Sequence, residues 1–149
     1  MVLKPMVEGD LLEMDPDFAE AHTSLFHLYT DRRQFAEARA VLDRRRAILG
    51  QTEPSLGDAQ LAAAEGRAET ARQILAGCER ASERQYVSGV GMACVRAVLG
   101  DKEAALRHLE RAYQDRDGSL AYLKTFAALE SLHSDPRYAA LMKKLGLPE

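Results

Sequence analysis

The sequence predicts an all-α fold: a right-handed α-solenoid of about three helix-turn-helix units, closed by a C-terminal helical cap. Apolar residues recur at helical spacing along most of the chain, and no stretch has the alternating pattern of a β-strand. A helical segment also recurs at intervals of 33 and 34 residues. Such a period is typical of solenoids, in which each helical pair buries its apolar face against the next.

Length and composition favour a single domain over residues 1–149. A chain of 149 residues, 46% hydrophobic and 29% charged, is long enough to bury a core without metal or disulfide support. The net charge of −3 gives no field that would attract nucleic acid or an anionic membrane. We see neither a signal peptide nor an apolar run of the roughly 18 to 20 residues that a bilayer requires. With two cysteines and no CxxC spacing, the expected location is the cytoplasm.

The first helical pair is expected over residues 15–50, after an irregular or short helical stretch at residues 1–14. Asp15 and Pro16 predict a helix start, because aspartate caps free amide groups and proline suits the first helical position. Helical spacing continues to residue 30, breaks at a polar stretch, and resumes from residue 35 to 49. Gly50 is placed to end this second helix in a left-handed conformation.

Two further pairs and a cap complete the expected order. The pair over residues 51–82 turns at Gly66, and the pair over residues 83–117 turns at Gly100. Residues 118–149 are predicted to be capping helices, namely two short pieces up to residue 132 and a final helix that starts at Pro136 and stops at Gly146.

The repeat is clearest in the second helix of each pair. A small residue recurs and a leucine follows it four positions later, at Ala38 and Leu42, Ala71 and Leu75, and Ala105 and Leu109. Alanine lets two helices cross closely, and the leucine one turn on fills the groove beside it.

These residues, together with Tyr29, Gly66, Gly100 and Ala112, resemble tetratricopeptide repeats over residues 15–117. The end of the chain resembles the closing segment of bacterial tetratricopeptide proteins, in which such repeats often follow a regulatory or catalytic domain. The resemblance implies an interaction scaffold that binds a protein or peptide, with no cofactor. The chain carries no catalytic motif, so we expect no enzyme.

Several residues depart from the repeat pattern. His22, Ser55 and Gly89 stand where the family prefers a bulky aromatic residue, which predicts looser packing in the second and third units. Arg45 and Asp58 stand at expected core positions, where unpaired burial would cost several kcal/mol. We therefore expect these two side chains to approach each other, or one of them to reach solvent.

The first helix of each pair is expected to line the concave side. By spacing, that side carries Glu20, Thr23, His27, Thr30, Leu56, Gln60, Ala63, Val87, Val90, Cys94 and Ala97. None of these is the lysine, asparagine or arginine with which family members grip a terminal carboxylate, so that clamp is not expected. The apolar half of this face could bind a peptide, and residues 119–132 are expected to fold back over it.

The remaining candidates have simpler interpretations. His22 and His27 are five residues apart, which does not suit a metal pair, and they are expected at the surface or an interface. Cys94 has apolar neighbours and is expected to be an inert buried thiol. The leading hypothesis is a module that binds protein or peptide; the alternatives are a homodimer formed through an exposed solenoid end, because residues 1–14 do not complete a repeat, and a small-ligand binder in the apolar half-groove.

Overall fold

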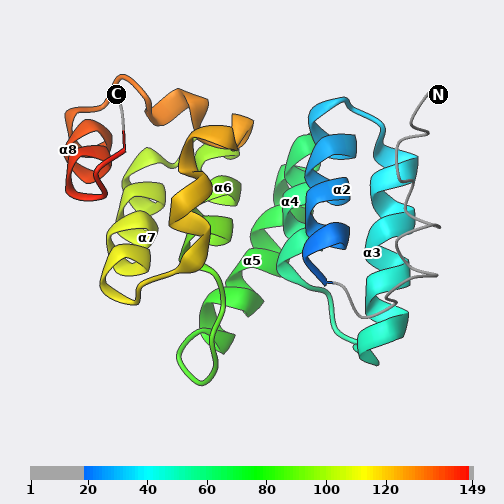
Figure 1. The fold of residues 1–149 in the computed structure, drawn as a ribbon. Helices are drawn as coiled ribbons and strands as arrows, with labels where there is room; N and C mark the ends of the chain where they lie inside the picture. Colours follow the sequence, from blue (N-terminus) through cyan, green and yellow to red (C-terminus); the bar gives the residue numbers. More distant parts are fainter. Residues whose placement is uncertain (1–18, 148–149) are drawn as a thin grey trace, which may run out of the picture.

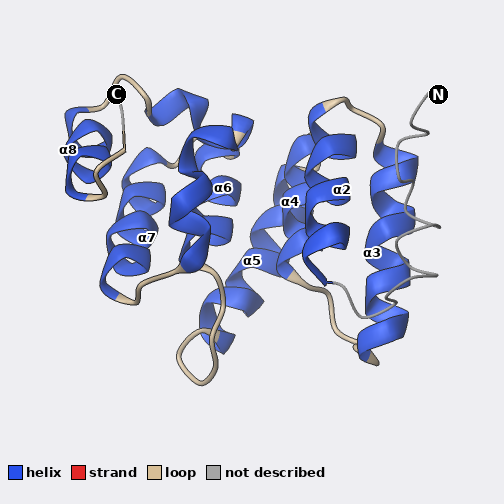
Figure 2. Cartoon of the chain, in the orientation of Figure 1, coloured by secondary structure: helices blue, strands red, loops and turns tan. Residues whose placement is uncertain are grey.

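A computed structural model describes residues 19–147, apart from the side chains of Ala19, Glu20, Ala21, Thr23 and Tyr122. Every regular element in that range is a helix, as the sequence predicts (Figures 1 and 2). The expected helix start at Asp15 and Pro16 and the stretch at residues 1–14 lie outside the described part. Among the described helices, none has both the length and the hydropathy to cross a membrane.

Each long helix packs most extensively against its neighbour in sequence (Figure 1). The pairs are α2 (Ala19–Asp31) with α3 (Phe35–Leu49), α4 (Leu56–Ala64) with α5 (Ala68–Ala81), and α6 (Gly89–Val98) with α7 (Lys102–Gln114). Helix α6 begins at Gly89, within the range expected for the third pair. Its first turn is capped by Ser88, whose hydroxyl accepts a hydrogen bond from the backbone N–H of Gly91.

The turns within the three pairs have the same backbone geometry at the repeat interval. Arg33, Gly66 and Gly100 all have positive φ angles, of 59°, 80° and 84°. In each turn the following N–H donates to the carbonyl five residues back: Gln34 to Tyr29, Arg67 to Ala62, and Asp101 to Arg96. This is the Schellman ending, which favours glycine at the left-handed position. The repetition seen in the sequence is therefore also a repetition of backbone geometry.

The core lies along the interfaces between helices. The aligned alanines and leucines all point into it: Ala38, Ala71, Ala105, Leu42, Leu75 and Leu109 are each buried. Three apolar clusters follow the chain, one on α2 to α4 around Leu61, one on α4 to α6 around Leu75, and one on α6 to α8 around Leu109. Burial on this scale is the main stabilising contribution expected for a helical fold.

Gly89 corrects the expectation of looser packing in the third unit. A Cβ atom added there would lie 2.9 Å from the carbonyl oxygen of His108 and 3.0 Å from the Cβ of Ala112. Helices α6 and α7 therefore approach so closely that only glycine fits. Of the two places expected for His22, the surface is wrong, because its side chain is buried.

The C-terminal part lies against α6 and α7. Two 3₁₀ helices, η1 (Gly118–Thr125) and η2 (Ala127–Leu132), bring Leu120, Leu123, Leu129 and Leu132 into one apolar cluster with α6. Helix α8 (Pro136–Lys144) follows, with the carboxylate of Asp135 accepting from the backbone N–H of Arg137 at its start. The 3₁₀ segment thus covers part of the face that α6 would otherwise present (Figure 1).

Candidate functional site

Helices α2, α4 and α6 and the junction of η1 and η2 enclose two adjoining hollows. The first, which we call the proximal hollow, has a volume of about 230 Å³. Its walls come from α2, α4, α6 and η2, and include His27, Thr30, Asp31, Val98 and Ala127.

The second, which we call the central hollow, has a volume of about 460 Å³ and extends from the same side chains toward the start of α4 and the loop before α6. The two hollows share Phe26, His27, Gln60, Cys94 and Phe126. We refer to the two together as the groove.

Most of the residues expected on the concave side do line the groove. His27, Thr30, Gln60, Ala63 and Cys94 line the proximal hollow, and Leu56, Val87 and Val90 join the central one.

The other expected residues have different places. Ala97 is buried and lines neither hollow. Val87 precedes α6 and is not on it. The side chains of Glu20 and Thr23 lie outside the described part.

The apolar positions expected to be accessible on α6 are largely covered. Val90, Cys94 and Ala97 are all buried, because the leucines of η1 and η2 pack onto the same cluster. The exposed apolar surface of the groove comes from other residues. Tyr86 is 70% exposed at the central hollow, and Val98 is 45% exposed at the proximal hollow. Exposed large apolar side chains at a concavity are typical of a binding surface.

The ring of Phe126 meets the ring of His27 across the groove. Their centroids are 5.3 Å apart in an edge-to-face arrangement, so the η1–η2 junction touches α2 as well as α6. Burial lowers the pKa of His27, and the nearby Asp31 partly opposes this by raising it. The imidazole is therefore neutral at pH 7 and can donate one hydrogen bond and accept another.

The described side chains that line the groove can form hydrogen bonds and apolar contacts, and the Cys94 thiol among them is unreactive. Burial raises the pKa of the Cys94 thiol to about 12, which keeps it protonated and a poor nucleophile. This agrees with the inert buried thiol that the sequence predicted. Among the described residues, no group of three or more histidine, cysteine, aspartate or glutamate side chains is arranged to hold a metal ion.

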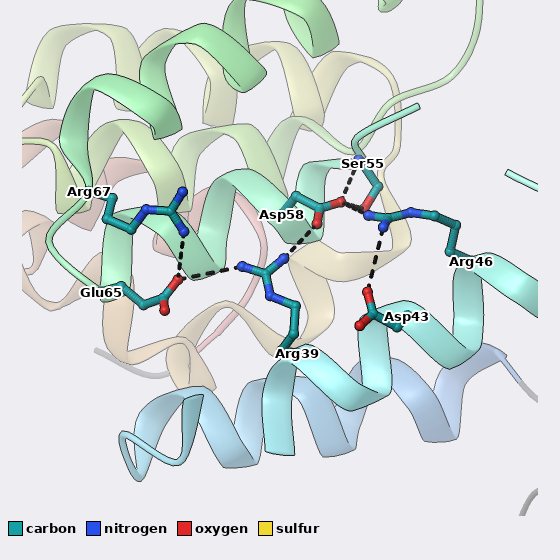
Figure 3. A network of polar contacts seen from close by, with 7 residues as sticks. All are labelled: Arg39, Asp43, Arg46, Ser55, Asp58, Glu65 and Arg67. Atoms are coloured by element: carbon teal, nitrogen blue, oxygen red, sulfur yellow. Dashed lines mark hydrogen bonds and ion pairs between the residues drawn. The ribbon is translucent and has the colours of Figure 1, made fainter. Parts of the chain in front are cut away.

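Asp58, at the start of α4, is the centre of a polar network beside the groove (Figure 3). Its carboxylate accepts from Arg39 at 3.0 Å and Arg46 at 2.5 Å on α3, and from the backbone N–H of Ser55 at 2.7 Å. The first alternative, an approach of Arg45 to Asp58, is therefore wrong; Arg45 is instead half-buried and lines the central hollow. Positions 39 and 46 are seven residues apart and share one face of α3, whereas Arg45 is rotated by about 100° from Arg46.

The network extends beyond Asp58 but stays balanced in charge. Arg46 also pairs with Asp43, and Glu65 pairs with both Arg39 and Arg67 (Figure 3). Burial alone would raise the pKa of Asp58, but the hydrogen bonds from Arg46 and Ser55 hold it below its ordinary value. The carboxylate is therefore ionised at neutral pH, and it joins α3 to α4.

Arg45 is one of the groove residues that sequence reasoning missed, with Phe26, Asp31, Tyr86, Val98 and Phe126. Spacing placed it against a partner helix, and the concave face was expected to lack arginine. The structure instead places Arg45 and Arg46 in the wall of the central hollow. The long arginine side chain reaches the central hollow from α3. A charged residue at an apolar position of the repeat was the sequence feature that could have indicated this place for Arg45.

Comparisons with protein-family models, with curated proteins and with solved structures give no match to this chain.

Proposed function

We propose that this chain is a helical-repeat interaction module of the tetratricopeptide kind, stacked as a solenoid, which binds an extended peptide segment of another protein in the groove. The observation that carries the proposal is the groove itself. Residues of α2, α4 and α6, helices that are not consecutive in sequence, line two adjoining hollows with exposed apolar side chains in each. A surface held by packed helices loses little entropy on association.

The composition of the groove suits a peptide. Tyr86 and Val98 offer apolar contact, while His27, Thr30 and Gln60 offer side-chain donors and acceptors for a main chain. A small ligand is less suited to the proximal hollow, which at about 230 Å³ is below the range of roughly 300 to 1,000 Å³ usual for small-molecule sites, whereas the central hollow, at about 460 Å³, lies within that range. We place the partner in the cytoplasm, since Cys78 and Cys94 are both free thiols.

Selection from a displayed library of random peptides, followed by fluorescence anisotropy with the selected sequences, tests the proposal. The buried Val90 and Cys94 are unsuitable as probes because charges there would disturb the core. We would instead combine Tyr86→Ser with Val98→Asp, which alter exposed groove residues. The matched control is Tyr113→Ser, an exposed aromatic on α7 that lines neither hollow.

The expected result is that wild type and the Tyr113 variant bind the selected peptides equally and the double variant binds them at least about tenfold more weakly. The proposal is contradicted if no peptide is enriched, or if the double variant binds as well as wild type.

Self-association remains the alternative, and one observation favours it. Leu28 on α2 is 43% exposed and Leu49 on α3 is 47% exposed, so the first pair presents apolar surface of its own. Mass measurement in solution across a range of concentrations decides the matter. A dimer that Leu28→Gln or Leu49→Gln dissociates supports the alternative, and a monomer at every concentration removes it.

A further inference from the structure

The two hollows of the groove carry opposite charges that have no partner in the described part of the chain. Of the described residues that line the central hollow, Arg45 and Arg46 are the only charged ones, and none is an aspartate or glutamate. Arg46 is paired with Asp58 and Asp43, whereas Arg45 makes no ion pair or hydrogen bond with any described residue. Its Nε atom is buried and has no acceptor in the part of the chain that the structure describes. A buried donor without an acceptor is destabilising until something accepts from it.

The proximal hollow carries the opposite, negative charge. Among the described residues that line it, Asp31, at the end of α2, is the only acidic or basic one apart from His27, which is neutral at pH 7. Asp31 makes no ion pair with a described residue. Burial raises the pKa of this carboxyl, and His27 partly opposes that shift. Within residues 19–147, a carboxylate without an ion-pair partner therefore lies at one end of the groove and a guanidinium without one toward the other.

Between these charges the groove is apolar. Phe26, Cys94 and Phe126 line both hollows, with Gln60 as the shared amide. Gln60 already donates to the carbonyl of Gly91, so its side chain is held in place between α4 and α6. A segment that lies in the groove would thus meet a positive group, apolar side chains and a negative group in that order.

We infer that the groove recognises a charge-ordered peptide, with an acidic side chain for Arg45 and a basic side chain for Asp31, separated by apolar residues. This inference rests on the proposed function and adds the class of the peptide and the order of its charges along the groove. The guanidinium offers a carboxylate two parallel N–H donors, a geometry that lysine cannot reproduce.

The acidic group is assigned to a side chain and not to a chain end. Gln51, Ser55, Leu56 and Val87, which line the central hollow near Arg45, also line a third depression. The surface therefore stays hollowed beyond Arg45, where a peptide can continue.

The test selects random dodecapeptides, displayed without a free C-terminus, on wild type and on the variants Arg45→Gln and Asp31→Asn. Arg44→Gln is the matched control, because Arg44 is the exposed neighbour of Arg45 and lines neither hollow. Thermal melting and circular dichroism establish that each variant is folded. The binding of one selected peptide and of its Glu→Gln and Lys→Gln analogues is then measured at low and at high salt.

We expect wild type and Arg44→Gln to enrich peptides with an acidic and a basic residue flanking apolar ones. Arg45→Gln should lose only the acidic preference, and Asp31→Asn only the basic one. The Glu→Gln analogue should bind wild type about tenfold more weakly but bind Arg45→Gln as the parent peptide does. Added salt should weaken the wild-type complex, because the Asp31 pair is exposed.

Two results overturn the inference while leaving the groove as a binding site: apolar peptides enriched without charge, or the same charge pattern enriched on Arg45→Gln or Asp31→Asn. The absence of any enriched peptide overturns the proposed function, and this inference with it.

Discussion

Asp58, buried at the first turn of α4, accepts a hydrogen bond from Arg46 near the end of α3, and this contact joins the first helical pair to the second. The same carboxylate accepts from the backbone N–H and the hydroxyl of Ser55, which forms a capping box at the start of α4. A buried charge is tolerated only where such partners surround it. The acidic residue at an apolar position of the repeat is thus a junction between two helical pairs.

Replacing Asp58 with asparagine should lower the free energy of unfolding by about 2 to 4 kcal/mol, because Arg39 and Arg46 each lose their most buried charge partner while the Ser55 contact persists. Asp43→Asn is the control. Asp43 also pairs with Arg46, but its side chain is 59% exposed, so the change should stay within about 1 kcal/mol. Urea unfolding of both variants provides the comparison, and similar losses for the two would argue against a central role for Asp58.

The same contacts predict how stability depends on pH. The pKa of Asp58 is below its ordinary value in the folded protein, so its contribution is fully present above the unfolded value of about 3.9. That contribution is lost as pH falls from about 4 toward the lower folded pKa. Wild type should therefore lose more stability than Asp58→Asn when urea unfolding is followed below pH 4. If the free energy of unfolding falls by the same amount in both proteins below pH 4, the prediction is contradicted.

Glycines at two helical positions should respond in opposite directions to alanine. Gly89→Ala should destabilise the protein by about 1 to 3 kcal/mol, because the new Cβ meets the backbone of His108 and the side chain of Ala112. Gly77→Ala on α5 should stabilise it by about 0.5 to 1 kcal/mol, since the nearest atom, Nη2 of Arg80, is 3.8 Å away and the unfolded chain loses freedom. Thermal melts measure this: the melting temperature should fall in Gly89→Ala and rise in Gly77→Ala. An unchanged melting temperature in Gly89→Ala would contradict the close approach of α6 and α7.

The titration of His27 reports the environment of the groove. Burial lowers the pKa of His27 while Asp31 raises it, so the imidazole should titrate below 6.5 in wild type and lower still in Asp31→Asn. Because the unfolded chain takes up the proton first, the free energy of unfolding should fall as pH drops below about 6.5. NMR of the imidazole signals measures both midpoints, with Asp115→Asn as an exposed control. A midpoint at or above 6.5 in wild type, or a rise in Asp31→Asn, would be inconsistent with a buried His27.

The local pattern of the sequence was sufficient for the helices and their turns. Gly66 and Gly100 predicted two chain reversals, and the recurring alanines predicted where helices cross. Both signals depend on residues close in sequence, which a single chain displays directly. The repeated left-handed position at Arg33 was harder to predict, because arginine has no preference for that conformation.

Contacts between distant residues could not be predicted in the same way. Each of three consecutive arginines could have faced Asp58, and only the rotation of α3 relative to α4 selects Arg46 and leaves Arg45 in the groove. The pattern at Gly89 predicted looser packing, whereas α6 and α7 lie so close together there that no side chain fits. The contact between Phe126 and His27 depends on the path of two short 3₁₀ helices, which have little periodicity to read.

The central claim is that the groove between α2, α4, α6 and the η1–η2 junction holds a peptide, and an NMR titration tests it most directly. Amide signals of uniformly ¹⁵N-labelled protein would be followed while a library-selected peptide is added. The account predicts saturable shifts at His27, Gln60 and Val98, with little change at Arg111 and Lys143 on α7 and α8. Shifts confined to the α7 and α8 surface, with the groove signals unmoved at saturation, would contradict it.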